Sequence, residues 1–165
     1  MKKILITGAS GFVGSYLVKY LIKNPDVEIY GTYLSDKSLT SLTELTSKIK
    51  LAKVDLMSSK DVFEIIEQIK PDEIYHLAAL TSAKVSFDNP EDVMVNNIVG
   101  QLNIFEAVRK LNLQTKIMII SSAEVYGIVS EEDLPIDEET KLNPANPYAV
   151  SKIAQDYLAL QYFNS

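Results

Sequence analysis

Short, largely apolar runs alternate along this chain with longer segments whose apolar residues recur every three or four positions. Runs that are apolar on both sides are typical of parallel strands buried under helices, and helical spacing predicts the covering helices. Right-handed crossovers then give an α/β fold, a doubly wound parallel sheet with strand order 3-2-1-4-5. The predicted strands are 4–6, 27–30, 49–54, 74–78 and 117–120, and the predicted helices start near Phe12, Val62, Pro90 and Pro147; residues 35–47 are predicted to be a loop or a weak helix.

Composition excludes several classes of function. The chain has 165 residues, a length that suits one domain, and its 16 basic against 22 acidic side chains give a net charge of −6, which argues against a nucleic-acid partner. It has no cysteine and one histidine, His76, so we expect no disulfide and no metal site, and a reducing cytoplasm is the natural setting. No apolar run approaches the roughly 20 residues of a membrane helix, so we expect no membrane partner. The acid-rich stretch 130–140 is predicted to be a solvated loop.

A glycine-rich loop follows the first predicted strand directly. It reads Thr7-Gly8-Ala9-Ser10-Gly11-Phe12-Val13-Gly14, with three glycines at a spacing of three. Gly8 permits a tight turn, Gly11 lets the backbone approach a pyrophosphate, and Gly14 lets helix and sheet pack closely. The N-terminus of the helix that follows offers N–H groups to phosphates. The loop therefore predicts a dinucleotide site, although glycines can also serve turn geometry alone.

The residues after the second and third predicted strands do not decide how a cofactor is bound. Asp55 follows the third predicted strand, where a carboxylate can meet an adenine amino group or, equally, serve a turn or a helix cap. The second strand is followed by neither an acidic residue at its very end nor an arginine, and Asp36 and Lys37 favour opposite cofactors. The choice between NAD and NADP is left undecided.

Hydroxyl and charged side chains gather in the last third of the chain. Tyr148 and Lys152 are four residues apart at the start of the last predicted helix, so they share a helical face. A nearby ammonium favours the phenolate form of a tyrosine, which suits proton exchange with a substrate hydroxyl or ketone. Ser122 follows the fifth strand and can donate a hydrogen bond to a reacting carbonyl. If that strand continues, Glu124 lies on the same side as Ser122 and could remove an acidified C–H proton; otherwise it is an exposed charge.

Together these motifs resemble the extended short-chain dehydrogenases/reductases of the nucleotide-sugar epimerase/dehydratase type. The matching segments are 7–14, Asp55-Leu56, His76-Leu77-Ala78-Ala79, Asn97-Ile98-Val99-Gly100, 121–127 and 147–152. The resemblance implies a Rossmann domain over residues 1–165 and the catalytic residues Ser122, Glu124, Tyr148 and Lys152. It also implies that Thr81, Ser82 and Asn97 lie at the substrate site, Asn97 supporting it from the long helix, and that His76 is structural. The implied cofactor contacts are Gly8, Gly11, Phe12, Val13, Gly14, Asp55, Leu56, Ala78, Ala79, Tyr148 and Lys152.

Within this family the chain is similar to GDP-mannose 4,6-dehydratases and to reductases of the resulting 4-keto sugar. The similarity implies a GDP-hexose substrate, oxidation at C4, removal of the C5 proton by Glu124 and loss of the C6 hydroxyl. A 4-keto-sugar reductase, a 4-epimerase and a non-catalytic dinucleotide-binding module are kept as alternatives. We expect a homodimer, and we interpret the chain as the N-terminal part of a longer enzyme, lacking the C-terminal substrate domain and weakly active or inactive alone.

Overall fold

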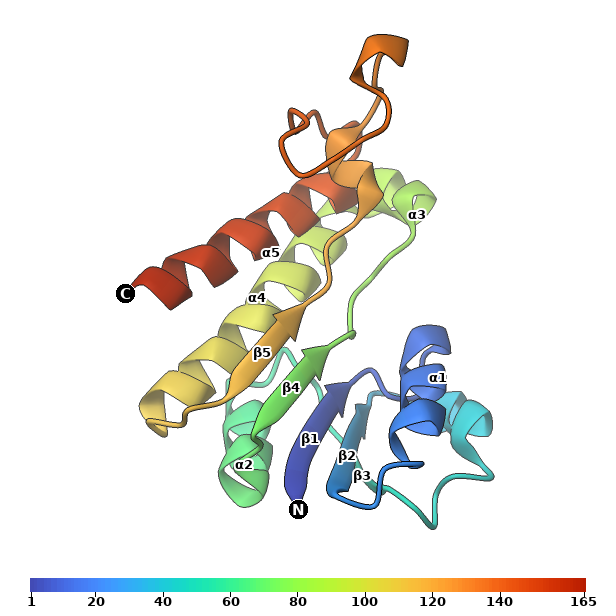
Figure 1. Cartoon of the computed structure of the whole chain (residues 1–165), viewed down its shortest axis with the longest axis vertical. Helices are drawn as coiled ribbons and strands as arrows, with labels where there is room; N and C mark the ends of the chain where they lie inside the picture. The colour runs from blue at the N-terminus through green and yellow to red at the C-terminus, as the bar shows by residue number, and fades with distance from the viewer. The chain divides into compact units, whose positions relative to one another are not determined.

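The computed structural model describes all 165 residues, and their contacts divide the chain into two compact units (Figure 1). Unit 1 comprises residues 1–79 and 99–120, and unit 2 comprises residues 80–98 and 121–165. The long helix α4 (Pro90–Lys110) contributes its first part to unit 2 and its second part to unit 1. The assignment of residues 1–165 to one cofactor-binding domain stays a prediction.

Unit 1 is built on a five-stranded sheet in which every neighbouring pair is parallel. The order is β3-β2-β1-β4-β5, which confirms the predicted order 3-2-1-4-5. All five strands therefore end at the same edge of the sheet, the edge at which ligands bind in open α/β folds. The strands are β1 (Lys2–Thr7), β2 (Val27–Tyr33), β3 (Lys50–Lys53), β4 (Glu73–His76) and β5 (Lys116–Ile119).

Alternate residues of the central strand β1 face two different apolar cores. Ile4 and Ile6 lie in a cluster with Val18 of helix α1 (Phe12–Leu21). Leu5 lies in the other cluster, with residues of helix α2 (Ser59–Ile69) and of the second part of α4. Because the sheet is covered on both faces, its central strands are apolar throughout rather than alternating.

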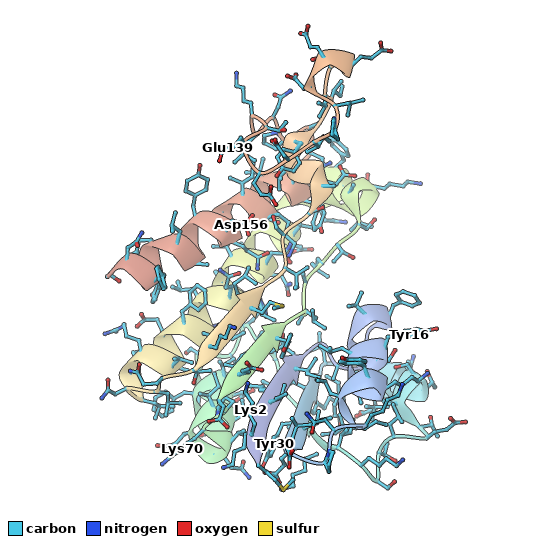
Figure 2. The ribbon with its side chains drawn as sticks, in the orientation of Figure 1. Lys2, Tyr16, Tyr30, Lys70, Glu139 and Asp156 are labelled. Atoms are coloured by element: carbon cyan, nitrogen blue, oxygen red, sulfur yellow. The ribbon has the colours of Figure 1, made fainter.

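Unit 2 consists of helices and loops without a strand. Helix α3 (Ala83–Asp88) and the short 3-10 helix η2 (Ala123–Tyr126) pack against helix α5 (Pro147–Asn164). The remaining 3-10 helix of this unit, η3 (Glu131–Asp133), lies in the acid-rich stretch, whose residues 130–139 are all exposed, as predicted. Figure 2 labels Glu139 in this loop.

Three differences from the sequence-based expectations concern local structure. Residues 35–47, expected to be a loop or a weak helix, contain the 3-10 helix η1 (Asp36–Leu42). Helix α3 was not predicted. The condition that the fifth strand continues to Glu124 is not met, because β5 ends at Ile119 and η2 begins at Ala123; Glu124 is exposed, as the alternative stated. None of the helices is both long and apolar enough to span a membrane.

Candidate functional site

The glycine loop links the end of β1 to the first turn of α1 within unit 1. Gly8 has a φ of +68°, a conformation that favours glycine, and a Cβ at Gly14 would lie 2.4 Å from the Gly8 carbonyl oxygen. Gly11 is the N-cap residue of α1 and provides no side-chain cap. The first N–H groups of a helix have no partner within the helix, so the loop presents backbone donors and a positive dipole end. This backbone fits the pyrophosphate of a dinucleotide.

The side chains of Phe12 and Val13 are exposed at the start of α1. Their contacts to a cofactor stay predictions, for which the backbone N–H groups of the first turn are available. Tyr16, one turn further along α1, stacks against Phe12 with ring centroids 5.1 Å apart, and Figure 2 shows Tyr16 on α1. The Lys19 ammonium lies 5.1 Å from the centroid of the Tyr16 ring.

Side-chain hydrogen bonds join the ends of β1 and β4, beside the glycine loop. The Thr7 hydroxyl oxygen lies 2.8 Å from Nδ1 of His76 and accepts a hydrogen bond from the Ala78 N–H at 3.3 Å. His76 is buried in this pair, consistent with the structural role implied by the resemblance. A Cβ at Gly8 would lie 3.0 Å from the backbone of Ala78. The segment Ala78-Ala79 is thereby held against the turn that is predicted to bind the cofactor.

Asp55 forms a turn before α2. Its carboxylate accepts a hydrogen bond from the Met57 N–H at 2.9 Å, and Ser58 rather than Asp55 is the N-cap of α2. The carboxylate is exposed, so the turn and the predicted adenine contact are compatible. The neighbouring Leu56 carbonyl accepts a hydrogen bond from the Asn103 side chain at 2.8 Å.

The end of β2 carries an ion pair that sequence spacing did not reveal. The Asp36 carboxylate lies 2.8 Å from the Lys53 ammonium at the end of β3. The hydrogen bond from Lys53 lowers the pKa of Asp36. Both side chains are exposed, so this pair contributes little to stability. The pair leaves the choice between NAD and NADP undecided.

Unit 2 brings the four predicted catalytic residues onto two elements that pack together, η2 and α5. The Ser122 hydroxyl accepts a hydrogen bond from the Glu124 N–H at 3.2 Å, which caps η2. The exposed Glu124 carboxylate accepts one from the Asn146 side-chain amide at 2.8 Å. The Asn146 side chain in turn caps α5 by accepting from the Ala149 N–H at 2.8 Å. Asn146 thus ties the Glu124 carboxylate to the start of the helix that carries Tyr148.

Tyr148 and Lys152 lie one turn apart on α5, and both are buried, at 7% and 4% exposure. Burial lowers the pKa of Lys152, while the Asp156 carboxylate acts in the opposite direction. Asp156, labelled on α5 in Figure 2, is hydrogen-bonded by the Ser121 hydroxyl. The Lys152 ammonium donates to Oε1 of Gln155 at 3.0 Å.

Asn97 crosslinks α4 and α5 inside unit 2. Its side-chain nitrogen donates to the Ser151 hydroxyl at 2.9 Å and to the Leu80 carbonyl at 3.1 Å, and its side-chain oxygen accepts from the Leu80 N–H at 2.8 Å. Asn97 is 1% exposed. This geometry supports the predicted role of Asn97 in holding the site, and a direct substrate contact stays a prediction.

Thr81 and Ser82 lie exposed at the start of α3. The Ser82 hydroxyl caps this helix by accepting from the Val85 N–H at 3.2 Å. Their substrate contacts also stay predictions. The structure adds Asn146 and Gln155 to the residues singled out from the sequence. The order Asn-Pro at a helix start was a usable signal for the cap, whereas nothing local marked Gln155.

Comparisons with known proteins show which proteins the chain is similar to. The chain is 34% identical to GDP-mannose 4,6-dehydratase from Vibrio cholerae, over 99% of this chain and 46% of that protein. It is 32% identical to UDP-glucose 4-epimerase from Mycoplasma pneumoniae, over 98% of this chain and 52% of that protein. The crystal structure of UDP-glucose 4-epimerase from Thermus thermophilus in complex with NAD superposes with a TM-score of 0.84 at 27% identity, over 98% of this chain and 51% of that one.

The chain thus spans about half the length of the curated relatives it matches. The profile of one family, described as GDP-mannose 4,6 dehydratase, matches residues 5–165, which is nearly the whole chain. The resemblance deduced from the sequence motifs is therefore confirmed at the level of the family. The chain belongs to the GDP-mannose 4,6 dehydratase family, among nucleotide-sugar dehydratases and epimerases.

Proposed function

We propose that this chain is the cofactor-binding half of a nucleotide-sugar 4,6-dehydratase that acts on GDP-mannose. The match of the family profile over residues 5–165 carries this proposal. NAD or NADP would be held by the glycine loop, whose backbone fits a pyrophosphate, with Asp55, Leu56, Ala78 and Ala79 as further contacts. NAD is bound in the Thermus thermophilus epimerase, which supports a nicotinamide cofactor here.

The bound nicotinamide would supply the hydride acceptor and donor. The chain's own residues handle the protons. Tyr148, with the Lys152 ammonium one turn away, takes the proton of the C4 hydroxyl. Ser122 donates a hydrogen bond to the carbonyl oxygen that forms at C4. Glu124 then removes the C5 proton, which the ketone has made acidic, and that proton leaves with the C6 hydroxyl as water. The hydride taken from C4 would return to C6 and a proton would return to C5, so that the cofactor ends unchanged.

Glu124 is suited to act as this base. Its carboxylate is exposed, so a substrate can reach it, and the bond from Asn146 fixes one of its oxygens. The similarity to UDP-glucose 4-epimerase favours a second candidate, a 4-epimerase, which needs Tyr148 and Lys152 but no base at C5. We further propose that the active enzyme is a homodimer and that the isolated chain turns over little or no sugar nucleotide.

Fluorescence titration with NADH and NADPH tests the cofactor part of the proposal. We expect saturable enhancement of nicotinamide emission with at least one of the two. Gly14→Val should abolish the fluorescence enhancement, because the valine side chain would collide with the Gly8 carbonyl. The matched control is Gly100→Ala, where an added Cβ meets only the Leu56 side chain at 3.4 Å. Absence of a saturable change with both cofactors would contradict the proposal.

A second arm of the same experiment separates dehydratase from epimerase. The chain is incubated for long times with cofactor, GDP-mannose or UDP-glucose, and D₂O, and the sugars are analysed by mass spectrometry. We expect trace loss of water from GDP-mannose with deuterium incorporation, abolished in Glu124→Gln. Epimerised UDP-glucose without deuterium at C5 would instead establish the second candidate. Rapid steady-state turnover would refute the expected weak activity of the isolated chain.

A further inference from the structure

Gln155 is a fully buried polar side chain that the proposed mechanism does not use. It lies on α5, three residues after Lys152, at 0% exposure. Burying an amide without hydrogen bonds is costly, so its partners explain why the residue is tolerated. Its partners include the Asn97 main-chain carbonyl, to which Nε2 donates at 2.9 Å, and the Lys152 ammonium, which donates to Oε1 at 3.0 Å.

The two partners fix which way the amide points. A carbonyl oxygen can only accept, so the amide nitrogen must face Asn97. An ammonium can only donate, so the amide oxygen must face Lys152. The amide therefore has one orientation that satisfies both neighbours. Asn97 is itself held by bonds from its side chain to Ser151 and Leu80, so the amide is anchored on a rigid support.

The chemistry of an amide differs from that of a carboxylate at this place. A lysine side chain is long and loses rotamer entropy when it is fixed, so a buried acceptor is needed to hold its ammonium. A carboxylate at this place would also hold the ammonium, as an ion pair, and would offset the positive charge of the lysine. The neutral oxygen of Gln155 holds the ammonium without adding a second negative charge to that of Asp156.

We propose that Gln155 is a positioning residue, whose amide, anchored on the Asn97 carbonyl, holds the Lys152 ammonium in place for its work on Tyr148. This inference rests on the proposed function for the role of Lys152. The test of the inference does not depend on the proposed function, because the ionisation of Lys152 can be followed without turnover.

The charged groups around Lys152 are the same in the wild type and in the Gln155→Leu and Gln155→Met variants described below. Asp156 on α5 acts on Lys152 directly. The other titratable side chains are Tyr148, Tyr157 and Tyr162 on α5 itself and, within unit 2, Lys84 and Asp88 of α3, Glu91 and Asp92 of the first part of α4, and Glu124 and Tyr126 of η2.

The experiment measures the pKa of Lys152 by NMR of the full chain labelled with ¹³Cε-lysine, the signal being assigned by its loss in Lys152→Met. In Gln155→Leu and Gln155→Met the acceptor is lost while burial persists, so we expect a downward shift of the Lys152 pKa. In Gln155→Glu we expect an upward shift, because a carboxylate favours the charged ammonium. The matched control, Gln161→Leu at an exposed position of α5, should leave it unchanged.

An unchanged Lys152 pKa in folded Gln155→Leu and Gln155→Met would overturn the inference. If neither variant folds, as judged by circular dichroism, Gln155→Glu decides: an upward shift supports the inference, and no shift overturns it. If the proposed function were wrong, the fluorescence titration would show no binding of NADH or NADPH. The Lys152 pKa would still be lower in Gln155→Leu and Gln155→Met than in wild type, and higher in Gln155→Glu.

Discussion

Gly127 occupies a turn that leaves no room for a side chain. Its φ is +61°, and a Cβ would lie 1.9 Å from the Asn143 carbonyl oxygen. This turn follows η2, and the nearby Val125 carbonyl accepts the Asn143 N–H at 3.0 Å. The loop that leads from the candidate catalytic residues of η2 towards α5 thus depends on one glycine.

We expect Gly127→Ala to lower the free energy of unfolding by at least about 1 kcal/mol, because both the backbone conformation and the space are incompatible with a Cβ. Urea unfolding followed by circular dichroism measures this. Gly100→Ala is again the control, and it should be neutral or slightly stabilising, since alanine is preferred to glycine inside a helix. Equal stabilities of wild type and Gly127→Ala would contradict the expectation.

Residues whose role is set by backbone geometry could be predicted from the sequence, whereas residues that act through distant partners could not. Gly8 and Gly14 were recognised because their spacing follows from how a strand, a turn and a helix join. Gln155 was not, because its partner Asn97 lies 58 positions away in the sequence. The Asp36–Lys53 pair was not predicted for the same reason, because Asp36 begins η1 and Lys53 ends β3, 17 positions further along the chain.

At the scale of the element, helix α5 depends on its cap. Asn146 accepts the Ala149 N–H and is followed by a proline at the first helical position, which suits the helix start. The same side chain donates to Glu124. The capping bond and the bond to Glu124 can be separated by substitution.

We expect Asn146→Ala to lower the free energy of unfolding by about 1 kcal/mol, because the cap is lost. Asn146→Ser should retain most of the stability, since serine is also a good N-cap, although it loses the amide that reaches Glu124. Thermal unfolding by circular dichroism compares the three proteins. If the serine variant were as unstable as the alanine variant, the cap would not be the main contribution of Asn146.

The elements that the sequence predicted are those with a buried periodic face. Helix α2 was recognised because Val62, Ile66 and Ile69 recur at helical spacing and are buried. Helix α3 has six residues, and its larger apolar side chains, Val85 and Phe87, are mostly exposed, so no buried stripe marks it. The 3-10 helix η2 was missed because the bond from the Glu124 N–H to the Ser122 hydroxyl turns the chain directly after the apolar run.

At the scale of the whole molecule, the buried Lys152 links stability to pH. Burial holds the pKa of Lys152 below its ordinary value in the folded chain. Unfolding exposes the side chain and restores a pKa of about 10.4. Between these two values the unfolded chain binds more protons, so this residue makes the free energy of unfolding rise with pH.

We therefore expect the stability of wild type relative to Lys152→Met to increase from pH 7 towards pH 10. Urea unfolding at intervals of one pH unit measures the difference, which cancels the contributions of all other groups. The stability of wild type relative to Lys152→Gln, whose side chain also cannot titrate, should increase with pH in the same way. A difference that stays constant over this range would contradict the expected shift.

The architecture could be predicted because general rules of chain connection leave few choices. Five parallel strands with right-handed crossovers and a glycine loop after the first strand favour the observed order β3-β2-β1-β4-β5. The division into two units could not be predicted, because helix α4 contributes to both and shows no break in its sequence pattern.

The Thr7 hydroxyl joins three stretches of backbone at the carboxyl edge of the sheet. It lies 2.8 Å from Nδ1 of His76 and accepts from the Ala78 N–H at 3.3 Å, because a hydroxyl oxygen has two lone pairs as well as one hydrogen. Replacing this hydroxyl with a methyl group, as in Thr7→Val, would remove both bonds at once. The segment after β4 would then be detached from the phosphate-binding turn, while the backbone ladder of the sheet stays intact.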